Sequence, residues 1–353
     1  MRNFISRIFV LVSAMAVIGL VIAAPTDPNP LLAKWEGPYG GVPPFDRVQI
    51  PLFKPALEAA MTEQLAEADR IAKDPAAPTF ENTLVALERT GRTLDRVTTL
   101  YGVWGATMNG PEFQAVQREM APKLAAFNDK ITQNEGLFRR IEAIYNSPRK
   151  SRMTPEQKRL AWLYYTNFVR SGARLNTQSK ARLSQINQEL AGLFTRFSQN
   201  VLAEETDQFI TLSSEADLAG LPQSVRDAAA AAATTRMEAG VGVIMNTRSS
   251  IDPFLTYSDR RDLREKAWRM FISRGDNGDE HDNNQIIPEI LRLRAERAKL
   301  LGFSTHAHWR LENAMAKTPE RAMELMEAVW KPAVARVHQE VGDMQALAER
   351  HGG

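Results

Sequence analysis

Two of the chain's five histidines, His306 and His308, lie within one short stretch that also contains Glu312. Imidazole nitrogens and carboxylates are common zinc ligands, so this stretch is the first candidate for a metal site. Ser304 or Thr305 is a suitable N-cap, which places both histidines in the first turn of a helix. Two residues apart on a helix corresponds to a rotation of about 200°, so the two rings cannot share one ion. His308 and Glu312 are one turn apart but lack a third ligand nearby, and we interpret both histidines as scaffold residues.

A second candidate is the acidic loop that surrounds His281, with Asp276, Asp279, Glu280 and Asp282. Oxygen-rich loops of this kind bind calcium in EF-hands, where ligand spacing is fixed. The spacing fails here, because Gly278 falls at the second ligand position and Ile287 at the position of the bidentate glutamate. We therefore predict a solvated loop between two helices.

The remaining catalytic patterns are absent from the sequence. No histidine has another four positions on, as a helical zinc hydrolase requires, and there is no Gly-x-Ser-x-Gly elbow. Gly240 and Gly242 lack the third glycine of a dinucleotide site, and His338 and His351 are isolated on a long terminal helix. We predict no catalytic, cofactor-binding or metal-ligating residue in this chain.

Composition excludes several classes of protein. The 353 residues are 44% hydrophobic, enough for a large core, and contain no cysteine, which rules out disulfides, zinc fingers and thiol catalysis. The net charge is +2 and the basic residues are spread along the chain. Nucleic acid is therefore not an expected partner.

The N-terminus has the pattern of a secretory signal. Arg2 and Arg7 precede an apolar run from Ile8 to Ile22, which is short for a bilayer span. We predict a signal peptide over residues 1–23, cut after Ala23, and a periplasmic or secreted protein without stable membrane association after cleavage. An uncleaved membrane anchor is the alternative.

The rest of the sequence predicts a mainly α-helical fold. Residues 24–54 are rich in Pro and Gly and should form an extended lead-in. Apolar residues at three- and four-residue intervals predict helices, and β-branched runs predict two short segments that pair as a hairpin or ribbon. The predicted helices span 55–73, 80–104, 154–168, 177–204, 224–236, 259–273, 285–301, 305–316 and 320–350. The predicted β segments are 208–212 and 242–247, the latter leading to a β-like stretch at 254–257. We divide the chain into an N-terminal helical region, 55–205, and a mixed then helical region, 206–353.

Several motifs, in the same order along the chain, resemble one known family. These are Pro78–Leu84, then Pro253–Thr256 followed by Asp259–Ala267, then Ala298–Gly302, continuing through Leu311–Ala316. They resemble the N-terminal portion of the thimet oligopeptidase and peptidyl-dipeptidase Dcp family of zinc metallopeptidases. The resemblance covers nearly all of residues 29–350.

The resemblance implies a multi-helix wall of a deep channel that admits short, unstructured peptides. In the family, zinc is held by a His-Glu-x-x-His helix and a downstream glutamate, and the glutamate of the motif is the general base. This chain lacks that motif, so residues 206–353 would begin the peptidase domain and stop before the zinc site. We expect zinc in the full-length family member, none bound by this chain, and no activity of the chain alone.

Two alternatives follow from the same resemblance. One is a non-catalytic helical scaffold that binds peptides. The other is one half of a split enzyme, completed by a separate C-terminal half that carries the zinc.

Overall fold

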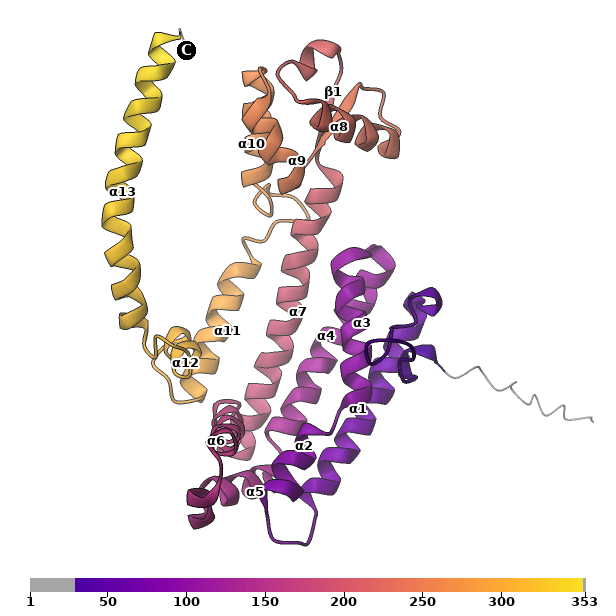
Figure 1. Cartoon of the computed structure of the whole chain (residues 1–353), viewed down its shortest axis with the longest axis vertical. Coiled ribbons are helices and arrows are strands. Elements are labelled where there is room, and N and C mark those ends of the chain that lie inside the picture. The colour runs from indigo at the N-terminus through magenta and orange to yellow at the C-terminus, as the bar shows by residue number, and fades with distance from the viewer. Residues whose placement is uncertain (1–28, 352–353) are drawn as a thin grey trace, which may run out of the picture.

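The computed structural model describes residues 29–351, and these residues form a mainly helical fold (Figure 1). The predicted signal peptide and its cleavage site lie outside the described residues. None of the helices in this part of the chain is both long and apolar enough to cross a bilayer. The helices are α1 (Ile50–Ala72), α2 (Ala86–Glu88), α3 (Arg92–Thr107), α4 (Pro111–Thr132), α5 (Glu135–Tyr145), α6 (Pro155–Arg170), α7 (Thr177–Asp207), α8 (Gln223–Arg236), α9 (Arg248–Tyr257), α10 (Arg261–Ile272), α11 (Ile286–Leu300), α12 (His306–Leu311) and α13 (Pro319–Arg350). The strands are β1 (Phe209–Leu212) and β2 (Gly242–Met245).

The N-terminal region is built on aromatic packing between α1, α3 and α4. Phe53 of α1 is fully buried, and its ring centroid lies 5.2 Å from that of Phe113 and 5.9 Å from that of Tyr101. Edge-to-face contacts of this kind stabilise a core beyond the area they bury. Phe53 lies in the first turns of α1, which begins at Ile50. The lead-in predicted to be extended over 24–54 is therefore helical from Ile50 on. Pro51 is tolerated there because it occupies the first turn, where a backbone N–H would have no intrahelical partner.

A second cluster joins α5 and α6 to a π-helical turn, Phe80–Val85. The turn opens with a capping box in which Thr79 and Asn82 bond each other's backbone N–H. The single helix predicted over 80–104 is wrong. The chain breaks at Gly91, which has φ +74°, and a Cβ there would lie 2.5 Å from the side chain of Gln64.

Helix α7 runs along the molecule between α4 and α11 (Figure 1). Leu183, Ile186 and Leu190 recur at helical spacing and are almost completely buried, and Leu293 of α11 is fully buried in one cluster with Ile186 and Leu190. Helices α4 and α5 were not among the predicted elements. In α4 the buried residues are few and widely spaced, as Phe113 and Met120 show. Helix α5 does carry closely spaced buried residues, among them Leu137, Ile141 and Ile144.

The two strands form the small antiparallel ribbon that the sequence predicted. Phe209 pairs with Met245 and Leu212 with Gly242. The stretch 254–257 is not β but the end of α9, since Ile251 and Phe254 are three residues apart and both are fully buried on one helical face. Helix α12 also ends earlier than predicted, at Leu311.

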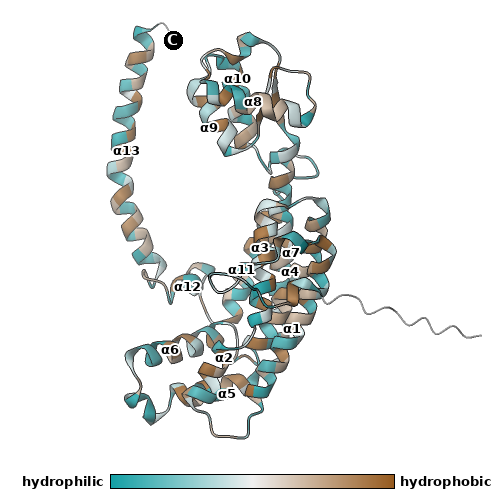
Figure 2. Cartoon of the chain, turned by 45° about the vertical axis from the view of Figure 1, so that its right-hand side comes forward, coloured by the Kyte–Doolittle hydropathy of each residue, from teal (hydrophilic) through white to brown (hydrophobic). Residues whose placement is uncertain are grey.

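Helix α13 has no buried residue and, among the described elements, packs mainly against α12 (Figure 2). Apolar side chains follow one another along it at intervals of three, four or seven residues and are about half exposed or more. They are Met323, Met326, Trp330, Val337, Val341, Met344 and Leu347. We call these residues the α13 stripe.

Arg140 of α5 provides the first testable prediction. It is 6% exposed and donates to the carbonyls of Asp74 and Ala76, at 2.8 and 3.0 Å, and to Asn82. Arg140→Met should lower the free energy of unfolding by about 3–5 kcal/mol, because these acceptors lose their donor. Urea denaturation measures the loss. Arg139→Met, at an exposed position on the same helix, is the control, and equal effects of the two variants would contradict this role for Arg140.

Candidate functional site

Helix α12, where the histidines lie, is fixed to the end of α6 by Arg170. This arginine is 8% exposed and donates to the Glu312 carboxylate and to the Trp309 carbonyl. The Trp309 indole N–H donates in return to the Arg170 carbonyl, at 3.2 Å. A helix of six residues is not stable by itself, so these contacts determine its position.

The contacts of His308 are structural. Thr305 is the N-cap, and its hydroxyl accepts from the His308 N–H at 3.3 Å and lies 2.8 Å from the His308 Nδ1. The His308 Nε2 lies 3.5 Å from Glu320 at the start of α13. Glu312 is bound to Arg170 instead, so the structure does not bring His308 and Glu312 together as a ligand pair.

His306 faces a cationic surrounding. Its ring packs 5.4 Å from that of Trp309, and its Nδ1 has no hydrogen-bond partner among the described residues. Burial, followed by the charges of Arg297, Arg294 and Arg310, lowers the pKa of His306 to about 4. The ring is neutral at physiological pH.

The acidic loop near His281 is mostly exposed, as predicted, and its carboxylates cap the loop's own backbone. Asp282 accepts from the N–H groups of Gly278 and Asn284, at 2.8 and 2.6 Å, and these bonds lower the pKa of Asp282. The loop is fixed from outside by Glu204 of α7. That carboxylate is 1% exposed and accepts from the Gly275 N–H and from Asn277.

The described residues do not supply a zinc site. Over residues 29–351, no group of three or more His, Cys, Asp or Glu side chains is arranged to hold a metal ion. No step of a zinc-dependent reaction is therefore assigned to these side chains.

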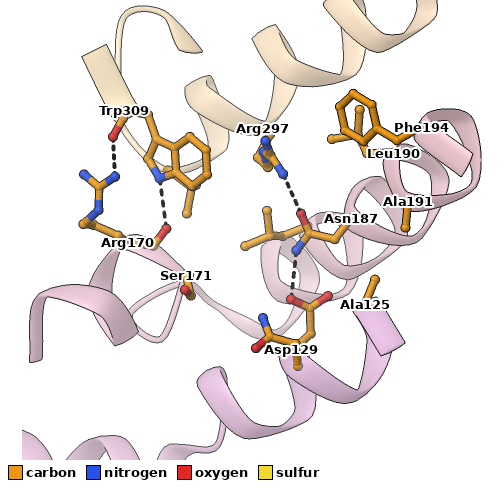
Figure 3. Close-up of a pocket in the computed structure, with 13 residues that line it drawn as sticks. Ala125, Asp129, Arg170, Ser171, Asn187, Leu190, Ala191, Phe194, Arg297 and Trp309 are labelled. Carbon is orange, nitrogen blue, oxygen red and sulfur yellow. Dashed lines mark hydrogen bonds between the residues drawn. The ribbon is translucent and has the colours of Figure 1, made fainter. Parts of the chain in front are cut away.

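A cavity of about 320 Å³ lies where α4, α7, α11 and α12 meet (Figure 3). Asp129, Asn187 and Arg297 form a polar chain at its wall. The Asn187 amide donates to Asp129 at 2.8 Å and accepts from Arg297 at 3.2 Å. Sequence analysis missed this site because its residues lie on helices far apart in the chain and follow no local motif.

Known proteins similar to this chain are peptidases. The chain is 33% identical to a dipeptidyl carboxypeptidase of Salmonella typhimurium over 92% of this chain and 48% of that protein. It is 31% identical to a dipeptidyl carboxypeptidase of Escherichia coli, over 93% and 48%, and 28% identical to an oligopeptidase A of Haemophilus influenzae, over 92% and 47%. The family model described as Peptidase family M3 matches residues 254–353.

The chain is related to peptidase family M3. This confirms the resemblance seen in the motifs, and the mainly α-helical fold agrees with it. Family M3 comprises zinc metallopeptidases. The chain spans about half the length of the curated relatives it matches.

The low pKa of His306 predicts a stability that depends on pH. The unfolded chain takes up a proton on this histidine near its ordinary pKa of about 6.5, whereas the folded chain resists protonation until about pH 4. The stability that neutral His306 contributes is thus present above pH 6.5 and is lost as the pH falls towards 4. His306→Asn should flatten this part of the profile, measured as urea midpoints at pH 7, 5.5 and 4.

The control is His338→Asn, because His338 is exposed on α13. An unchanged slope in His306→Asn would show that another group causes the loss of stability.

Proposed function

We propose that this chain forms the N-terminal channel wall of a zinc metallopeptidase that hydrolyses short, unstructured peptides. The supporting observation is the 33% identity to a dipeptidyl carboxypeptidase across 92% of the chain. Both a dipeptidyl carboxypeptidase and an oligopeptidase A are among the similar proteins, so the proposal covers removal of C-terminal dipeptides and internal cleavage.

In this proposal the chain forms part of the channel wall and supplies no side chain that takes part in the reaction. Zinc, when bound in the full-length protein, would supply the activated water through ligands that these residues do not include. The described helices would line the channel and exclude folded proteins, and α7 with its neighbours provides a rigid wall for that purpose. We further propose that the chain acts outside the cytoplasm, on the basis of the signal-like residues 1–23.

Purification of the endogenous protein tests this proposal. An antibody to residues 80–100 should recover the protein from the extracytoplasmic fraction, together with peptidase activity and stoichiometric zinc. Activity should disappear with a chelator and return with zinc. An N-blocked pentapeptide with a free C-terminus, compared with its C-terminal amide, separates dipeptide removal from internal cleavage.

Recovery of a zinc-free protein without turnover on either peptide would contradict the proposal. The bacterially expressed chain of residues 24–353 is the matched control, and we expect neither stoichiometric zinc nor turnover from it.

We also propose that the α13 stripe packs against a zinc-bearing half of the same type of peptidase, either in the same polypeptide or as a separate chain. The supporting observation is that Met326, Trp330 and Val337 follow one another on one face and are each more than half exposed. Exposed apolar surface of this extent is typical of interfaces.

Trp330→Glu and Val337→Glu test the α13 stripe. In the chain alone, neither variant should change the urea midpoint measurably, because these side chains make no buried contact. Co-expressed with a family M3 half that carries the His-Glu-x-x-His motif, both should weaken co-purification and restored turnover on the order of tenfold or more. Arg336→Glu, away from the stripe, is the control. Equal association of all variants would contradict the proposed interface.

A further inference from the structure

The cavity between α4, α7, α11 and α12 contains two charged groups that the fold does not pair with each other directly. Asp129 of α4 is 4% exposed, and its Oδ2 accepts no hydrogen bond from any described residue. Arg297 of α11 makes no ion pair with a described carboxylate, and its Nε has no partner. Burying either charge without a close counter-charge costs free energy.

The side chain between these two groups keeps them apart. Asn187 donates to the Asp129 Oδ1 and accepts from the Arg297 Nη1, so one carboxamide separates the carboxylate from the guanidinium (Figure 3). Burial raises the pKa of Asp129, and this effect outweighs the opposite effects of Ser184, Asn187 and the charge of Arg297.

The rest of the cavity wall is largely apolar, with Asn128, Arg170 and Ser171 as its further polar residues. Leu183 and Leu190 of α7 are almost completely buried at its edge, and Phe194 and Trp309 add aromatic surface. The Arg297 guanidinium lies 4.6 Å from the Trp309 ring, which orients the cation while leaving its edge available. The volume of about 320 Å³ corresponds to roughly ten water molecules and lies at the small end of ligand pockets.

We propose that this cavity binds a small zwitterion, a free amino acid or a dipeptide, with an apolar side chain. The ligand carboxylate pairs with Arg297, its ammonium group lies at Asp129, and its side chain packs against Leu190 and Phe194. A simple anion fits less well because it would meet the Asp129 carboxylate, and a simple cation would meet Arg297. The proposal concerns binding only and does not depend on peptidase activity.

Ligands in which the ammonium or the carboxylate group is blocked test these two charge pairings in the full chain. Isothermal titration calorimetry with L-leucine and L-alanyl-L-leucine should show saturable binding, and comparison of the two gives the preferred length. N-acetyl-L-leucine and L-leucinamide each lack one charge, and each should bind on the order of tenfold more weakly or worse than leucine.

Two variants assign the charges to their residues. Asp129→Asn should abolish the discrimination against the acetylated ligand, and Arg297→Gln should abolish the discrimination against the amide. Asp343→Asn and Arg321→Gln, at exposed positions of α13, are matched controls and should retain both. Ala191→Phe, which fills the cavity from α7 without removing a charge, should abolish binding of every ligand.

Far-UV circular dichroism and urea midpoints establish that each variant folds. If either charge variant fails to fold, discrimination by the wild type together with loss of binding in Ala191→Phe still supports the proposal. Absence of saturable binding by leucine and the dipeptide, or equal binding of capped and uncapped ligands, would overturn it.

Discussion

The packing of α7 between α4 and α11 is the interaction on which the other parts of the structure depend. At 31 residues, α7 is about 46 Å long, so it reaches from the α6 turn to the β ribbon. Its residues Leu183, Ile186 and Leu190 are almost completely buried, because the neighbouring helices α4 and α11 shield this part of α7 from water. Hydrophobic burial of this kind holds the helices together but does not by itself define how far one helix slides along another.

Polar contacts along α7 define that position. Arg182 binds both oxygens of Glu296 on α11, at 2.6 and 2.8 Å, and Gln199 accepts from Arg118 of α4 at 2.7 Å. Near the end of α7, Glu204 bonds the loop that leads to α11. Each contact requires a particular residue opposite, so a shift by one helical turn would leave several buried polar groups without partners.

The sequence predicts those helices and strands whose ends are determined by residues close to them in the chain. Thr154 and Gln157 form the predicted capping box at the start of α6, and the β segments pair as predicted. Prediction fails where tertiary contacts override the local pattern. The π-helical turn and the break at Gly91 are stabilised by Arg140 and by Glu67, which lie outside that segment. Asp129 and Arg297 are ordinary charged residues in sequence, and only packing brings them to the same cavity.

The histidine-rich stretch shows why residue type alone is a poor guide to a site. His308 and Glu312 have the chemistry of metal ligands, but Thr305, Glu320 and Arg170 already bind them. These contacts are needed because α12 is too short to be stable without them. A ligand site requires groups whose interactions the fold leaves incomplete, and in this region that condition is met by Asp129 and Arg297 rather than by His308 and Glu312. Residues of a candidate site are thus recognised by the hydrogen bonds or counter-charges that they lack in the folded chain. No local sequence pattern contains this information.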